Sequence, residues 1–300
     1  MRSSRTRRWG VVCVVAAAAG LVTVHSPTSA APAVAGPGQV DLTFLNINDF
    51  HGRIDANTVK WAGTVEMLRA AAGEANTALL AAGDNVSASL FASAVQGDQP
   101  TIDVLNALDL DASAVGNHEL DQGFLDLTGR IINGGANAQF AFLAANIYDS
   151  GGDTVLPQYA LLSVGGQTVG VIGAVTQETP SLVSPGGVVG LTFGDPVDAV
   201  NRVAAELSDG NPANGEADIL VAEYHEGASD GTPPSSLAQE LAKGGMFAKI
   251  VNQTSALVDA IFTGHTHKAY AWDGPVPGDP TRTRPLLQTG SYGEHAGKEV

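Results

Sequence analysis

Short apolar runs rich in β-branched residues alternate along the chain with segments whose apolar residues recur at helical spacing. The spacing of Trp61, Val65 and Leu68 predicts a helix, and Asp195-Pro196 predicts another that begins with a capping carboxylate. Strands are predicted at 40–47, 77–82, 112–115, 140–147, 160–164, 168–175, 219–222, 258–262 and 285–288, and further helices at 102–108 and 124–131. This alternation predicts an α/β sandwich with parallel and mixed sheets.

The connections between these elements have the composition of turns. Gly165-Gly166-Gln167 separates two strand-like runs and predicts a hairpin. Segments 179–194, 226–236 and 272–284 are rich in Gly and Pro, so we expect them to be surface loops.

The first 35 residues have the pattern of a secretory signal peptide followed by a short linker. Four arginines precede an uncharged run at 11–24, and small residues follow at 28–33. The run is shorter than the roughly 20 residues that a membrane-spanning helix needs, although a membrane anchor or a buried helix is the alternative interpretation. We therefore expect cleavage near residue 30 and a protein that is secreted, extracellular or held in the cell envelope.

Removing this leader makes the chain more acidic. The whole chain has 15 Lys+Arg and 31 Asp+Glu; four of the basic residues and none of the acidic ones lie in the leader. Such a surface repels phosphate backbones, so no nucleic-acid polymer is expected as a partner. The single cysteine, Cys13, also lies in the leader. Disulfides are thereby excluded, and any metal must be bound through oxygen and nitrogen ligands.

Residues that can bind metals cluster where predicted strands end. They are Asp49, His51, Asp84, Asn117, His118, His225, His265 and His267. Five of the six histidines outside the leader are in this set. A lone histidine would be interpreted as an ordinary surface or core residue. In open α/β sheets, however, ligands bind beyond the carboxyl ends of the strands, so this arrangement indicates a site.

The ligand set is larger than one tetrahedral ion needs. Carboxylates, an amide oxygen and several imidazoles suit two divalent cations with open coordination positions. Paired ions need an anionic bridge, and Asp84, alone at its strand end, is the candidate. Such a pair polarises a phosphoryl oxygen and makes hydroxide available near neutral pH, which indicates a phosphate ester as substrate.

Five segments in order resemble the blocks of the calcineurin-like metallophosphoesterases. They are Asn48-Asp49-Phe50-His51-Gly52, Gly83-Asp84-Asn85, Gly116-Asn117-His118-Glu119, Tyr224-His225 and Gly264-His265-Thr266-His267. The first of these, and the run from Gly116 to Asp121, are similar to the secreted 5′-nucleotidase, UDP-sugar hydrolase and 2′,3′-cyclic phosphodiesterase group. The resemblance implies a four-layer αββα sandwich, with two mixed sheets flanked by helices.

The same resemblance implies a role for each residue of the set. Asp49, His51 and His267 would hold one ion, Asn117, His225 and His265 the other, and Asp84 would bridge them. His118 would contact the phosphate or protonate the leaving oxygen, with Asp121 orienting its ring. Hydroxide between the ions would attack phosphorus in line with the leaving group. The two divalent ions could be Zn, Mn, Fe, Ni or Co.

Several neighbouring polar residues are expected to have structural or surface roles instead of catalytic ones. Glu119 is expected to be a structural hydrogen-bonding residue, and Asp121 could instead cap the following helix. Asn85 could face the phosphate or serve the turn. Glu226 is expected to be a solvated loop acid. Asp55, Asp98 and Asp126 are expected to be surface charges.

The resemblance also bears on domains and substrates. Residues 40–300 would form the catalytic domain, apparently truncated, because relatives add a C-terminal domain that stacks on the nucleobase and this chain lacks it. The expected function is a secreted phosphohydrolase acting on small-molecule phosphoesters such as nucleotides: a 5′-nucleotidase-like phosphomonoesterase, a cyclic phosphodiesterase or a nucleotide-sugar pyrophosphatase. The alternative is a metal-binding but catalytically idle module. Metal identity, base or sugar specificity, cell-wall anchoring and oligomeric state stay open.

Overall fold

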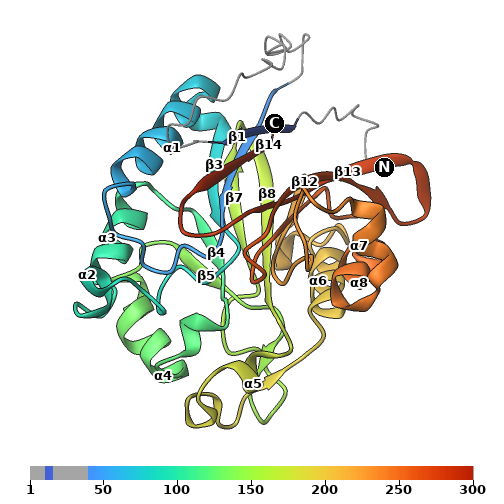
Figure 1. Cartoon of the computed structure of the whole chain (residues 1–300). Coiled ribbons are helices and arrows are strands. Elements are labelled where there is room, and N and C mark those ends of the chain that lie inside the picture. Colours follow the sequence, from blue (N-terminus) through green and yellow to red (C-terminus); the bar gives the residue numbers. More distant parts are fainter. Residues whose placement is uncertain (1–10, 16–39, 300) are drawn as a thin grey trace.

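Two six-stranded sheets lie face to face in the computed structural model, which describes residues 11–15 and 40–299 (Figure 1). The first sheet has the order β1-β14-β2-β3-β4-β5, and the second has the order β12-β13-β11-β10-β8-β7. The strands of the first are β1 (Val11–Val15), β14 (His295–Glu299), β2 (Thr43–Ile47), β3 (Thr77–Ala81), β4 (Ala112–Ala114) and β5 (Ala141–Leu143). Strands β2 to β5 are parallel, and β14 is antiparallel to both β2 and β1.

The second sheet is also mixed. Its strands are β12 (Ala269–Val276), β13 (Asp279–Thr289), β11 (Ala260–Thr263), β10 (Ile219–His225), β8 (Gln167–Val175) and β7 (Tyr159–Val164). The four inner strands are parallel, whereas β7 and β12 pair antiparallel at the edges. A small ribbon joins β6 (Ile147–Tyr148) to β9 (Thr192–Phe193).

Helices cover both outer faces (Figure 1). The α-helices are α1 (Thr58–Ala72), α2 (Phe91–Ala94), α3 (Gln99–Ala107), α4 (Phe124–Asp126), α5 (Thr179–Leu182), α6 (Pro196–Glu206), α7 (Leu237–Lys243) and α8 (Gly245–Gln253). Shorter helical turns are Glu74–Asn76, His118–Leu120, Leu127–Ile132, Asn133–Gly135, Pro185–Val188 and Pro212–Asn214. Within residues 40–299, none of the helices combines the length and apolar character that a bilayer crossing needs.

Three apolar clusters separate the four layers. In β2, Leu45 packs toward the helices of the first sheet, while its neighbour Phe44 joins the cluster between the sheets. This is the alternation expected of a strand buried on both faces. A third cluster fills the space between the second sheet and α6 and α8. The predicted four-layer αββα sandwich with two mixed sheets is confirmed.

Local predictions were confirmed at two sites in particular. Gly165 and Gly166 both have positive φ and close the β7–β8 hairpin, as two-residue hairpin turns require. The side chain of Asp195 accepts hydrogen bonds from the backbone N–H groups of Val197 and Asp198 and so caps α6.

Other local predictions were wrong. The run 140–147 is split into β5 and β6, because the backbone N–H of Ala144 bonds to Pro157 and that of Ala145 to Gly173. Segment 272–284 is most of the β12–β13 hairpin, and 179–194 contains α5, a helical turn and β9. Of the predicted leader, only Val11–Val15 lie within the described residues, as β1; the rest of it lies outside them.

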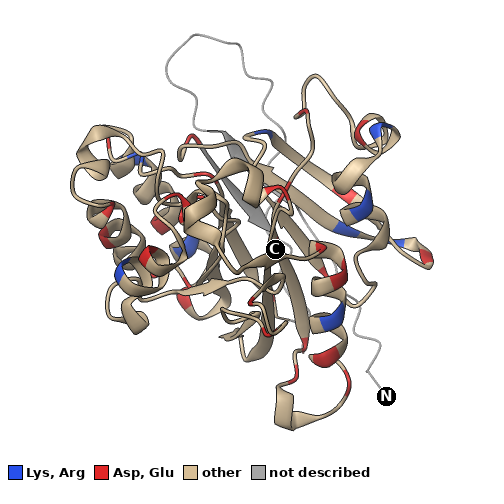
Figure 2. Ribbon diagram, turned by 90° about the horizontal axis from the view of Figure 1, so that it is seen from below, with Lys and Arg blue, Asp and Glu red and all other residues tan. Residues whose placement is uncertain are grey.

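The negative charge is spread over the molecule. Figure 2 shows acidic residues on helices and loops around the sheets, interspersed with fewer basic residues. The chain has a formal net charge of -16.

Candidate metal centre

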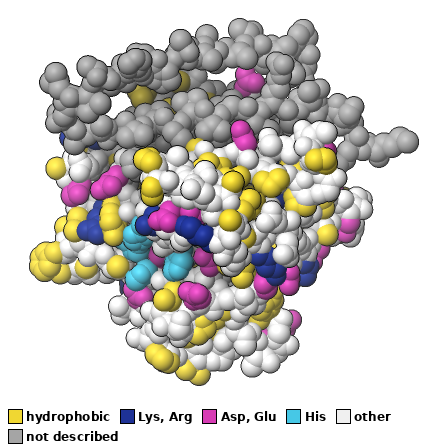
Figure 3. Space-filling view, turned by 45° about the vertical axis from the view of Figure 1, so that its right-hand side comes forward, with side chains coloured by type: hydrophobic (Ala, Val, Ile, Leu, Met, Phe, Trp, Pro, Cys, Tyr) yellow, Lys and Arg dark blue, Asp and Glu magenta, His cyan; other side chains and the backbone are white. Residues whose placement is uncertain are grey.

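Both sheets direct the carboxyl ends of their parallel strands toward one site. Asp49 and His51 follow β2, Asp84 follows β3, and Asn117 and His118 follow β4. From the second sheet come His225, the last residue of β10, and His265 and His267, which follow β11. Figure 3 shows histidine side chains gathered in one hollow, with basic and acidic side chains beside them.

Ligand-type atoms in this cluster lie within 4.8 Å of one another in three overlapping groups. The groups are Asp49, His51 and His267; His51, Asp84 and His118; and Asp84, His225 and His265. Asp84 is thus shared between residues of the two sheets, and His51 links it to Asp49 and His267. The structure brings together every residue that the sequence placed in this set.

Two glycines allow the loops to approach so closely. A Cβ on Gly116 would lie 2.1 Å from Asp84 Oδ1, and one on Gly83 would lie 2.6 Å from His225 Nδ1. Real Cβ atoms do not come this near other atoms. A side chain at Gly116 would therefore displace Asp84, and one at Gly83 would displace His225.

The backbone holds two of the imidazoles with Nε2 facing the cluster. His51 Nδ1 lies 3.1 Å from the carbonyl oxygen of Ser87, and His225 Nδ1 lies 2.8 Å from that of Ala82. A carbonyl can only accept a hydrogen bond, so each Nδ1 carries the proton and donates it. In the neutral ring Nε2 then carries a lone pair, and this is the tautomer that can bind a metal through Nε2.

Acceptor atoms converge on these lone pairs. His225 Nε2 lies 3.1 Å from both Asp84 Oδ2 and Asn117 Oδ1, and His51 Nε2 lies 3.2 Å from His267 Nε2. Where two of these atoms both present lone pairs, they repel unless a proton or a cation lies between them. The donor set of carboxylate and amide oxygens with imidazole nitrogens therefore fits divalent cations.

The pKa values of the cluster also indicate that positive charge is stabilised there. Burial opposes ionisation of both Asp84 and His225, but their mutual attraction lowers the pKa of Asp84 and raises that of His225 to about 10. Burial, together with the charge of His225, lowers the pKa of His265 to about 4. A proton on His225 thus supplies the positive charge that a cation would otherwise bring.

Five residues of the cluster have a left-handed backbone conformation. The φ angles are 51° at Asp49, 47° at His51, 55° at Asp84, 70° at His265 and 58° at His267. Residues with a Cβ rarely adopt positive φ, and such strained residues gather at functional sites.

Glu119 links two of the loops that carry the cluster. Its buried carboxylate accepts hydrogen bonds from the backbone N–H groups of Gly116 (2.6 Å), Asn85 (2.7 Å), Asp84 (2.8 Å) and Val86 (3.3 Å). These contacts fix the loop after β3 to the loop after β4, so Glu119 is the structural hydrogen-bonding residue that the sequence indicated. Burial, with the nearby Asp84 charge, raises the pKa of Glu119 to about 7.

His118 and Asp121 form a pair at the edge of the cluster. His118 Nδ1 lies 2.7 Å from Asp121 Oδ2. The side chain of His118 is 32% exposed and that of Asp121 is 26% exposed. The hydrogen bond raises the pKa of His118 more than burial lowers it. The ring of His118 contacts that of His51 edge-on, with centroids 4.9 Å apart.

Two neighbouring residues, Glu226 and Asp98, were predicted wrongly, whereas Asn85 had two open interpretations. Glu226 is not a solvated loop acid: it is half-buried and accepts a hydrogen bond from Thr176 Oγ1 at 2.9 Å. Asp98 is not a surface charge, because it is buried and accepts hydrogen bonds from the Ser87 N–H and the Ser93 hydroxyl. Asn85 is fully buried, and its Nδ2 donates to Ser113 Oγ.

The sequence reasoning missed the residues that support the cluster. Asp98 holds Ser87, whose carbonyl in turn orients His51. Arg53 and Tyr292 lie beside the histidines and were not singled out, although Arg53 falls only two residues after His51. A basic residue this close to a metal-binding motif could have indicated that Arg53 belongs to the site.

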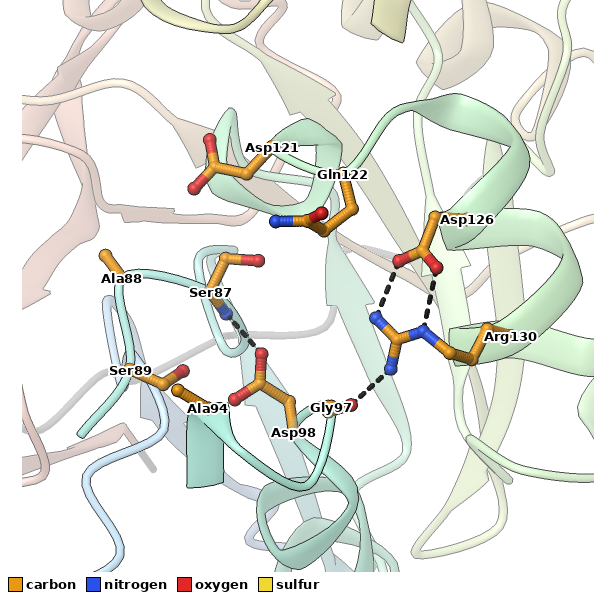
Figure 4. Close-up of a pocket in the computed structure, with 10 residues that line it drawn as sticks. All are labelled: Ser87, Ala88, Ser89, Ala94, Gly97, Asp98, Asp121, Gln122, Asp126 and Arg130. Carbon is orange, nitrogen blue, oxygen red and sulfur yellow. Dashed lines mark hydrogen bonds and ion pairs between the residues drawn. The ribbon is translucent and has the colours of Figure 1, made fainter. Parts of the chain in front are cut away.

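A polar pocket of about 370 Å³ opens beside Asp121 (Figure 4). Ser87, Asp98 and Gln122 line it, and an ion pair between Asp126 and Arg130 closes one side. The pocket therefore adjoins the supports of His51 and His118.

Comparisons with known proteins bear on this architecture. The model of the calcineurin-like phosphoesterase family matches residues 42–269. Endonuclease YhcR of Bacillus subtilis is 30% identical over an alignment of 283 residues, which covers 86% of this chain and 22% of that protein. A 5′-nucleotidase of Vibrio cholerae is 28% identical over 273 residues, covering 84% of this chain and 45% of that protein. The chain thus spans less than half the length of these relatives.

Solved structures agree on the fold. A putative 5′-nucleotidase from Staphylococcus aureus superposes with a TM-score of 0.65 at 23% identity, covering 86% of this chain and 50% of that one. The fold is that of the calcineurin-like phosphoesterases, and the donor set of the cluster fits divalent cations. The chain belongs to the calcineurin-like phosphoesterase family.

Proposed function

We propose that the cluster holds two divalent cations and that the protein hydrolyses phosphoesters of small molecules, nucleotides foremost, outside the cytoplasm. Asp49, His51 and His267 would bind one cation, and Asn117, His225 and His265 the other. Asp84 would be shared. The sharing of Asp84 and His51 among three ligand-type groups is the observation that carries this proposal.

The bound cations would supply Lewis acidity toward a phosphoryl oxygen and a nucleophilic water near neutral pH. The protein's own residues supply the remaining chemistry. His118, protonated because Asp121 accepts from its Nδ1, would present Nε2–H to the leaving oxygen and give it a proton as the P–O bond breaks. Asp121 would keep the ring in that orientation.

The substrate class and location come from relatives and from the N-terminal pattern. The matched relatives include the Vibrio 5′-nucleotidase and a cell wall protein of Listeria monocytogenes, which is 28% identical over 83% of this chain. The leader-like residues 1–35 fit export. Residues 40–300 would be the catalytic domain.

The test is hydrolysis of AMP and p-nitrophenyl phosphate by the full chain with added Mn²⁺ or Zn²⁺. Turnover is expected, EDTA should abolish it, and Asp84→Asn should lose both metal and activity. Asp273→Asn, at an exposed acid on β12, is the matched control. Two bound metals without any turnover would favour the catalytically idle module instead.

A further inference from the structure

Arg53 lies at the rim of the cluster and is held there by an aromatic ring. Its guanidinium carbon lies 3.9 Å from the centroid of the Tyr292 ring. The loop before it is closely packed, since a Cβ on Gly52 would lie 2.2 Å from Ser89 Oγ. The backbone N–H of Arg53 bonds back to Phe50, so the position of Arg53 is fixed at its base as well as at its tip.

Tyr292 itself belongs to the wall of the site. Its backbone N–H donates to the carbonyl of Asp49 at 2.8 Å. Its ring centroid lies 5.3 Å from that of His267 and 5.8 Å from that of His51. The guanidinium and the two imidazoles therefore border the same aromatic ring.

The side chain of Arg53 has no hydrogen-bond or ion-pair partner among the described residues. Its buried Nε makes no hydrogen bond, and the side chain forms no ion pair there. By contrast, Arg69, Arg130 and Arg202 each pair with an acid, and Arg284 donates to backbone carbonyls. A buried donor without an acceptor is costly, and stacking on an aromatic face leaves the edge of the guanidinium free to donate. An anion at the rim could accept hydrogen bonds from the terminal N–H groups of the guanidinium and offset this cost.

We propose that Arg53, held on Tyr292, binds the phosphoryl oxygens of the substrate and favours phosphomonoester dianions over diester monoanions. This inference rests on the proposed function, because it places the phosphoryl group at the cluster. The planar guanidinium presents parallel N–H groups that match two phosphate oxygens. Near neutral pH a monoester carries close to two negative charges, whereas a diester carries one and has an esterified oxygen in place of a charged one.

The experiment compares Arg53→Met, which keeps the stem but removes the guanidinium, with Arg53→Lys, Tyr292→Leu and Tyr292→Phe. Arg282→Met, at an exposed arginine on the β12–β13 hairpin, controls for net charge. KM and kcat are measured for p-nitrophenyl phosphate and bis-p-nitrophenyl phosphate with Mn²⁺, and the dissociation constant of inorganic phosphate by calorimetry. Metal content and circular dichroism check that each variant is folded and loaded.

Arg53→Met should raise KM for the monoester and the phosphate dissociation constant by about tenfold or more, while KM for the diester changes less than about threefold. Tyr292→Leu should act in the same direction. Tyr292→Phe, which keeps the ring under the guanidinium, should lose less than Tyr292→Leu, and Arg282→Met should resemble the wild type. Unchanged phosphate binding in Arg53→Met, or equal losses for both substrates, would overturn the inference.

The calorimetry separates this inference from the proposed function. If the wild type binds phosphate but hydrolyses neither substrate, the proposed function fails while a weaker affinity in Arg53→Met still supports an anion site. If the loaded wild type binds no phosphate, the Arg53 inference is wrong.

Discussion

The carboxylate of Glu119 accepts a hydrogen bond of 2.8 Å from the backbone N–H of Asp84, the residue shared between the two halves of the cluster. The same carboxylate holds Gly116 from the loop after β4. The position of the shared ligand is therefore set by a side chain that does not itself enter the ligand groups.

Glu119→Gln should destabilise the fold and loosen metal binding. A glutamine amide turns its NH₂ group toward backbone N–H groups that need acceptors, which should lower the free energy of unfolding by about 2 kcal/mol. Urea denaturation and metal titration would measure both effects. Glu178→Gln, on an exposed side chain, is the control, and a Glu119→Gln protein with wild-type metal affinity would contradict the positioning role.

His118→Ala should keep both metals and lose most of the rate. Proton transfer to a leaving group contributes about 100-fold or more, so kcat for AMP should fall by that factor. Metal analysis of the purified variant distinguishes the roles: a loss of one ion per chain would mean that His118 is a ligand.

Asp121→Asn should shift the pH profile. The hydrogen bond to Asp121 raises the pKa of His118, so replacing the carboxylate with a neutral amide should lower that pKa. The protonated fraction of His118 at neutral pH then falls, and the alkaline limb of kcat/KM should move to lower pH. Profiles between pH 5 and 10 would show this shift; an unmoved limb with reduced rate would leave Asp121 a purely structural role.

Asp195→Ala should affect stability but not activity. Burial disfavours the charged form, yet Lys249 and the N–H groups of α6 hold the pKa of Asp195 below its ordinary value of 3.8. The stabilisation is therefore fully present above that value and is lost as the pH falls through the lower folded pKa. The variant should lose about 1 kcal/mol at pH 7 and progressively less in acid. Equal losses at pH 7 and pH 2.5 would count against the ionised cap.

Sequence alone predicted the features that are local in the chain. The helix around Trp61, the cap at Asp195 and the hairpin at Gly165 each depend on a few adjacent residues. The ligand-type residues were found because polar side chains directly follow apolar strands. Parallel strands bring such positions to one edge of a sheet.

The wrong predictions depend on strand pairing and hydrogen bonding that composition alone does not reveal. The run 140–147 is apolar except for Asn146, and the backbone bonds from Ala144 to Pro157 and from Ala145 to Gly173 show where it leaves the first sheet. Segment 272–284 has the composition of a loop, yet pairing within the β12–β13 hairpin makes it strand. Asp98 resembles a surface charge until Ser87 and Ser93 fold onto it.

The left-handed backbone at Asp49, His51, Asp84, His265 and His267 has a consequence for motion. Each such residue costs roughly 1 kcal/mol relative to ordinary conformations, so the rim stays in place only while something else restrains it. Bound cations would provide that restraint. Chelation should accordingly let the segments 48–52 and 264–267 open locally, with faster amide hydrogen exchange there than in either sheet.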